Sequence, residues 1–170
     1  MSLFSAESVS FETPVAMLIA CHDRVRQYAD LTLKLAQYLL KEGPDAKAQE
    51  AAAGILRYFD IAAPLHHSDE DLDLFPLLSQ YGQPELKTVI ASVSAEHEEL
   101  GELWQDVRSY LLPLAAGQAG TLPLALAAEF AKRYPAHADL EESAIYPFAE
   151  QLIDAATLTA IGKNMANRRL

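Results

Sequence analysis

Cysteine is almost absent from this chain, since Cys21 is the only one among 170 residues. One cysteine cannot form an internal disulfide, so a disulfide-stapled secreted scaffold is excluded and a reducing compartment, the cytoplasm, is expected. The N-terminus also lacks a basic leader, and the apolar run 15–21 is far shorter than the ~20 residues that span a bilayer. We therefore predict neither a signal peptide nor a membrane-spanning helix.

Positive charge is scarce as well. The chain has 13 Lys and Arg residues against 24 Asp and Glu residues, a formal net charge of −11. Nucleic acids and anionic membranes are therefore not expected as partners. The sequence shows no Ser-His-Asp set and no phosphate-binding glycine loop. Triad hydrolysis and nucleotide chemistry are accordingly not indicated.

Strand patterns are missing too, whereas apolar residues recur at helical spacing through most of the chain. We predict four long helices at about 13–41, 45–82, 84–112 and 121–152, a loop at 113–120 and a short helix at 155–167. Thr13-Pro14 and Asp154 mark helix starts, and Gly43-Pro44 marks a helix end. Short links between long helices favour an up-down-up-down bundle. The expected fold is all-α, a four-helix bundle over 13–152 with a short C-terminal helix, in one domain over 1–170.

Both ends of the chain carry weaker signals. Residues 1–12 show no strong pattern and are expected to form a mobile arm or a short strap. Arg168 and Arg169 follow the last predicted helix, where their positive charge would suit the negative end of the helix dipole.

One pattern occurs twice, at 64–76 and at 135–147. Each copy reads proline, one residue, histidine, three residues, glutamate, an acid, three residues, an aromatic residue and proline. A histidine and a glutamate four apart lie on one helix face with Cβ atoms ~6 Å apart, which suits binding of one metal ion. Pro64 and Pro135 fall inside helical patterns, and we interpret them as kinks that tilt the two turns toward a common centre. Two helix breaks are the alternative.

The first and third helices each add one histidine on the apolar stripe, His22 and His97. Folded antiparallel, the chain would bring six residues to one depth: His22, His66, Glu70, His97, His137 and Glu141. Unpartnered buried carboxylates would each cost several kcal/mol, so a cation is favoured over a plain network of hydrogen bonds.

Nitrogen and oxygen ligands without thiolate point to iron, manganese or zinc. Six ligands are too many for one tetrahedral zinc. They fit two ions, with His22 and His66 on one and His97 and His137 on the other. Glu70 and Glu141 would then bridge the pair.

Four neighbouring residues are further candidates. His67 could be a fifth imidazole, but it lies about 100° round the helix from His66 and a solvated or supporting position is preferred. Asp71 and Glu142 either orient ligands or face water. Tyr134 could donate a hydrogen bond to a bound ligand, although core packing is the favoured interpretation.

The chain resembles the hemerythrin-like family, the HHE cation-binding domain. The resemblance is carried by the six residues above, by the Glu96-His97 pair, and by the His-x-x-x-Glu turns that end in an aromatic residue and proline. The tail of the chain from Leu158 to Arg169 is similar to the closing helix of bacterial members. The resemblance implies a bundle around a non-haem centre of two iron ions, with zinc or manganese as possible substitutes. It also implies that the protein binds a small molecule, namely dioxygen, peroxide or nitric oxide. The protein would then act in sensing, stress response or iron handling. A di-iron redox enzyme and a regulatory module with a structural metal core remain alternatives, and no protein partner is indicated.

The chain departs from the oxygen-carrying members at one position. Those proteins place two histidines four apart on the third helix, whereas here Val93 precedes His97 by four residues. With four imidazoles, both irons would keep a place for a ligand. Unless His67 supplies a further donor, we expect a reduced centre that reacts with dioxygen and oxidises readily rather than a durable carrier.

Overall fold

The structure, a computed structural model, describes residues 9–170, so most of the predicted N-terminal arm lies outside it. Every regular element among these residues is helical. They are α1 (Pro14–Glu42), α2 (Ala46–Arg57), the π turn η1 (Tyr58–Ala62), α3 (Ala63–Asp69), the π turn η2 (Glu70–Leu74), α4 (Phe75–Tyr81), α5 (Pro84–Ala115), α6 (Leu124–Ala144), the 3₁₀ turn η3 (Tyr146–Phe148), α7 (Ala149–Leu152) and α8 (Ala155–Asn167).

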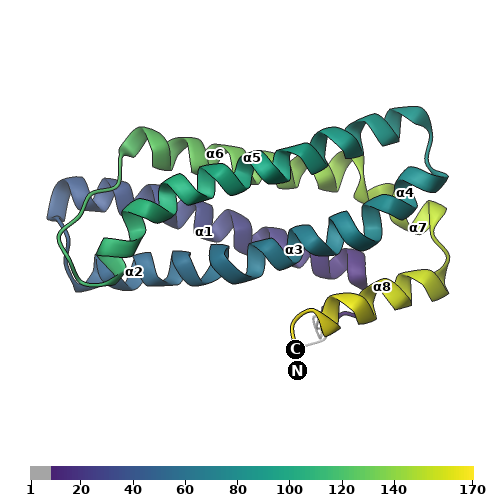
Figure 1. Cartoon of the computed structure of the whole chain (residues 1–170), viewed down its shortest axis with the longest axis horizontal. Helices are drawn as coiled ribbons and strands as arrows, with labels where there is room; N and C mark the ends of the chain where they lie inside the picture. The colour runs from purple at the N-terminus through teal and green to yellow at the C-terminus, as the bar shows by residue number, and fades with distance from the viewer. Residues whose placement is uncertain (1–8) are drawn as a thin grey trace, which may run out of the picture.

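These elements form a four-helix bundle, as predicted. The elements from α2 to α4 follow one another without a break and form one long helix, which packs beside α1 and α5 (Figure 1). α6 completes the ring by packing against α1 and α5. The short α8 lies against α1 and α3 at one end (Figure 1). This confirms the all-α bundle with a C-terminal helix.

The helix boundaries follow from their capping residues. Asp45 and Asp154 accept hydrogen bonds from the backbone amides of Ala48 and Thr157, at 3.0 and 2.8 Å, and thereby cap α2 and α8. Such caps typically contribute ~1 kcal/mol. Gly43 ends α1 with a φ of 77°, which glycine adopts without strain.

Two predicted helix ends were wrong. α5 continues through Pro113 to Ala115, because a proline in the last turn removes only one backbone bond before the helix ends anyway. The fourth helix stops at Ala144 instead of residue 152, and the chain continues as η3 and α7. Pro147 disfavours helical geometry in the residue before it, and this break turns Tyr146 into the core.

The two internal prolines are accommodated differently. Pro64 follows the π turn η1, and a second π turn, η2, begins at Glu70. π turns occur mostly as single insertions in α-helices, often at functional sites. Pro135 lies inside α6, which is α-helical throughout. The bend at either proline stays a prediction.

The core has three zones along the bundle axis. One apolar cluster includes Phe59, Trp104 and Phe130, and a second includes Phe75 and Ile145. Buried histidines and glutamates lie between them, since His22 is flanked along α1 by Leu18 and Val25, one from each cluster. An apolar cluster therefore borders the polar layer on each side along the bundle axis.

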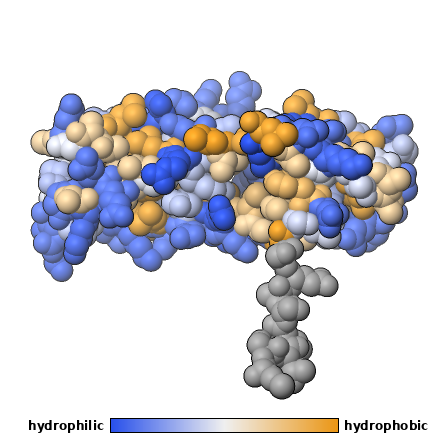
Figure 2. Space-filling view, turned by 90° about the horizontal axis from the view of Figure 1, so that it is seen from below, coloured by the Kyte–Doolittle hydropathy of each residue, from blue (hydrophilic) through white to orange (hydrophobic). Residues whose placement is uncertain are grey.

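The surface is mostly polar. Hydrophilic residues cover much of the face shown in Figure 2, with hydrophobic groups scattered among them. Within residues 9–170, no helix combines the length and apolarity that crossing a bilayer requires.

Candidate metal centre

The polar layer contains all six residues predicted as metal ligands. Their donor atoms fall into two groups, and the donor atoms of each group lie within 4.8 Å of one another. His22, His66, Glu70 and Glu141 form the first group, and His97 and His137 belong to the second. All six side chains are buried.

The first group has the spacing of ligands around one ion. The Nε2 atoms of His22 and His66 are 3.0 Å apart. With metal–nitrogen bonds of about 2.0–2.1 Å, two imidazoles at right angles on one ion have nitrogens roughly 3 Å apart. Glu141 Oε2 lies 2.9 Å from His22 Nε2, and Glu70 Oε1 lies 3.4 Å from His66 Nε2.

Each carboxylate also reaches the second group with its other oxygen. Glu70 Oε2 is 3.3 Å from His97 Nε2, and Glu141 Oε1 is 2.9 Å from His137 Nε2. Glu70 and Glu141 thus lie between the two sets of imidazoles, the geometry that a bridging ligand requires.

Three donor atoms of the polar layer are buried and have no hydrogen-bond partner. They are Glu70 Oε2, Glu141 Oε2 and His137 Nε2. The 2.9 Å contacts of Glu141 lack the alignment of a hydrogen bond, and orphaned buried polar atoms of this kind are costly. A cation between the imidazoles and the carboxylates would satisfy them, so the residues present fit a metal.

Carboxylates outside the layer fix two of the imidazoles. Asp71 Oδ2 lies 2.7 Å from His97 Nδ1, and Glu96 Oε2 lies 2.8 Å from His137 Nδ1. Such contacts turn the opposite nitrogen toward a metal and raise its basicity. Asp71 thus has the orienting position considered from the sequence, whereas Glu142 is 3.7 Å from His22 Nδ1 and pairs mainly with Arg26.

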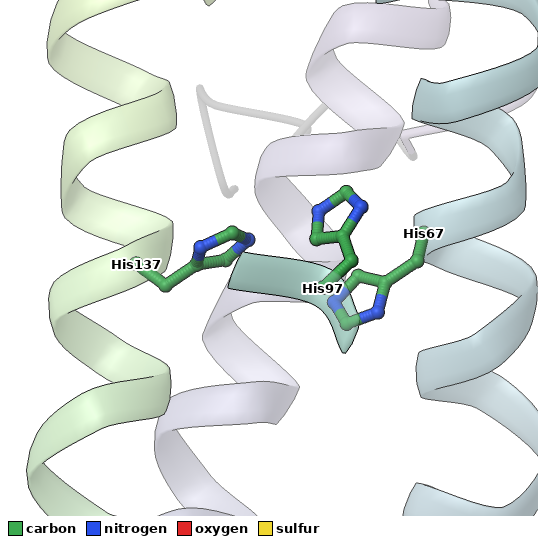
Figure 3. Close-up of side chains that lie close together, drawn as sticks. All are labelled: His67, His97 and His137. Atoms are coloured by element: carbon green, nitrogen blue, oxygen red, sulfur yellow. The ribbon is translucent and has the colours of Figure 1, made fainter. Parts of the chain in front are cut away.

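His67 lies beside two of the predicted ligands. It belongs to the second group with His97 and His137, and its ring stacks on that of His97 with centroids 3.9 Å apart (Figure 3). Half-buried beside His97, His67 has a position that fits the supporting role preferred from the sequence and also a fifth donor, so metal binding by His67 stays a prediction. Burial, together with the charge of His97, holds the pKa of His67 well below its ordinary value. A neutral imidazole is the form that binds metal.

The aromatic residue that ends each repeat also reaches the layer, which the sequence analysis did not foresee. Phe75 stacks on His97, and Tyr146 stacks on His22 with centroids 5.4 Å apart. The Tyr146 hydroxyl donates to Glu70 Oε1 and lies 3.2 Å from His22 Nε2. Tyr134 instead donates to the Leu100 carbonyl at 3.3 Å and packs in the first apolar cluster, as the favoured interpretation stated.

The carboxylates of the layer raise the pKa values of the imidazoles around them. Burial alone would lower the pKa of His97, but the carboxylates of Asp71, Glu141 and Glu70 raise it to about 11. The pKa of His66 and that of His137 are likewise lowered by burial but raised overall, chiefly by Glu70 and Glu141 respectively. The neighbouring carboxylates therefore favour the protonated form of these imidazoles in the metal-free protein.

This protonation predicts proton release on metal binding. Up to three protons, from His66, His97 and His137, should leave, because only neutral imidazole binds a metal. In the metal-free protein, the stabilisation from His97 is complete below its ordinary pKa and is lost as pH rises through about 11. The gain in thermal stability on adding metal should thus grow from about pH 6 to about pH 8. Titration calorimetry in buffers of different ionisation enthalpy measures the protons, and no release would contradict the assignment.

A buried layer of imidazoles and carboxylates inside a four-helix bundle defines a cation-binding helical protein. Comparison with known families agrees: residues 13–149 match the model of the hemerythrin HHE cation binding domain. The chain belongs to this family and binds metal ions. An uncharacterized protein from Haemophilus influenzae is 34% identical over 160 residues, covering 94% of this chain and 92% of that protein.

Proposed function

We propose that the chain is a non-haem di-iron protein that binds or reacts with dioxygen or a related small ligand such as peroxide or nitric oxide. The observation that carries this proposal is the pair of donor groups that share two buried carboxylates. Iron bound there would supply reversible one-electron chemistry and affinity for small diatomic ligands. The free Cys21 suits a reducing compartment such as the cytoplasm.

The two ion positions are unequal in their donors. His67, His97 and His137 offer three imidazoles to one ion, whereas His22 and His66 offer two to the other. The expectation that both ions keep a vacant place was based on four imidazoles. With His67 as a fifth donor, we infer that the ion held by His22 and His66 is the less saturated one.

Tyr146 lies beside that less saturated position. Its buried hydroxyl donates its single proton to Glu70 and contacts His22. When Glu70 binds a metal, that proton would become available for a hydrogen bond to a ligand at this position. Phe75, its counterpart in the first repeat, has no hydroxyl. Of the two aromatic residues that end the repeats, only the one on the side with fewer imidazoles thus supplies a hydroxyl donor.

Stopped-flow mixing of the di-ferrous protein with dioxygen tests this function. We expect an optical change that requires iron, and a rate or product that differs in Tyr146→Phe while iron content stays the same. A di-ferrous protein that is inert to dioxygen, peroxide and nitric oxide would contradict the proposal and favour a structural metal core.

A further inference from the structure

A cavity of about 370 Å³ lies between α3 and α5 and reaches the metal centre. His67 and His97 form part of its wall, so it touches the second donor group directly. The rest of the wall is largely aromatic or aliphatic, from Phe59, Ala63, Pro64, Trp104 and Tyr134, whereas Glu98 and Gln105 are exposed. A single water molecule takes about 30 Å³ of liquid volume, so the cavity has ample room for a diatomic molecule.

Gly101 keeps this cavity wide. It lies inside the 32-residue helix α5, where glycine is less favourable than alanine. A Cβ atom at Gly101 would meet no atom within 4 Å, so packing does not require glycine there. The missing side chain leaves space beside the two imidazoles.

The equivalent place in the other half of the bundle is closed. Arg26 follows His22 by four residues, as Gly101 follows His97, and it lies at the interface of α1 with α6. Its guanidinium binds Glu142, and it also binds Asp139 at 2.7 Å. One side of the centre is thus covered by ion pairs while the other side opens into the cavity.

We propose that the cavity between α3 and α5 is the access route and holding site for small uncharged ligands of the centre, dioxygen or nitric oxide. Apolar walls favour uncharged molecules, and the carboxylate of Glu98 disfavours anions. His67 lines the cavity, and none of the hydrogen bonds among residues 9–170 involves its ring, whereas carboxylates hold His97 and His137. The ring of His67 can therefore move aside most easily and let a ligand pass to the less saturated ion beside His22 and His66.

This inference rests on the proposed function for the ligand's destination, but the route itself can be measured without metal. Trp104 is the only tryptophan of the chain, lines the cavity and is 4% exposed. Its fluorescence in the metal-free protein reports which quenchers enter. Dioxygen should quench Trp104 efficiently, and iodide should quench it weakly.

Gly101→Leu is the blocking variant and Gly101→Ala is its control. A leucine side chain occupies much of the path, so we expect quenching by dioxygen to fall at least about threefold with leucine and to stay near the native value with alanine. Glu98→Gln should raise quenching by iodide, which tests the charge effect without filling the cavity. Equal dioxygen quenching in the native and leucine proteins, or iodide quenching as efficient as that by dioxygen, would overturn the proposal.

The iron-loaded protein gives an independent reading of the same route. The rate of the optical change with nitric oxide should fall in Gly101→Leu, while its iron content and thermal midpoint match those of Gly101→Ala. Equal rates in the two variants would refute the route and leave the di-iron function standing. A native protein that binds no iron would refute the di-iron function, and the quenching result would still decide the route.

Discussion

Replacing Glu141 with glutamine is expected to remove most of the metal from both positions. Glu141 is fully buried, and its two oxygens face His22 on one side and His137 on the other, each at 2.9 Å. The amide of glutamine has the shape of the carboxylate but lacks its negative charge, which would contact both ions. Metal present at 100 times its dissociation constant stabilises a protein by ~2.7 kcal/mol, and each kcal/mol shifts the midpoint of a domain this size by ~2–4 °C. The native midpoint should therefore rise by at least about 5 °C with metal, and that of Glu141→Gln should hardly respond.

The matched control is Glu142→Gln. Glu142 is the next residue, but its carboxylate pairs with Arg26 and lies 3.7 Å from His22 Nδ1, the nitrogen that faces away from Glu141. This variant should keep its metal. Elemental analysis and melting curves with and without chelator give both quantities, and a Glu141→Gln protein with a full metal content would refute the shared carboxylate.

Replacing Arg168 and Arg169 together by methionine is expected to destabilise the fold by about 3–5 kcal/mol, because it leaves a buried carboxylate unpaired. Asp69 has no exposed surface, and Arg168 and Arg169 approach its oxygens at 2.8 and 2.7 Å. Methionine preserves the apolar stems. Chemical denaturation would show the loss as a lower midpoint.

Two further variants separate charge from packing. Arg57→Met removes an exposed arginine that forms no ion pair among the described residues, and it should change stability by less than about 0.5 kcal/mol. Adding Asp69→Asn to the double variant should recover part of the loss, since the charge that needs a partner is gone. A double variant as stable as the native protein would show that α8 is not held by Asp69. Because Glu70 follows Asp69, the same variant should also weaken metal binding.

The bundle and six of the clustered residues could be predicted because both follow from local spacing. The His-x-x-x-Glu turns put two side chains on one helix face, and the repeat made a shared centre the simplest explanation. The aromatic residues Phe75 and Tyr146 were part of the pattern, but their approach to His97 and His22 depends on how η2 and η3 depart from a regular helix.

His67 and Asp69 show what local spacing cannot give. In a four-helix bundle the inward face of a helix is more than 100° wide, so His66 and His67 can both point into the core although they are adjacent. The sequence assigned Arg169 to the dipole of the last helix, and it does donate to the Met165 carbonyl at 2.6 Å. Its bond to Asp69 joins residues 100 positions apart, and only the packing of α8 on the bundle brings them together.

Anomalous diffraction at the iron edge, from crystals of protein loaded anaerobically with ferrous iron, tests the central claim most directly. The account predicts two peaks roughly 3.5–4 Å apart, the spacing usual for paired metal ions. One should lie beside His22 and His66, the other beside His67, His97 and His137, with Glu70 and Glu141 between them. A single peak, or none, would contradict it.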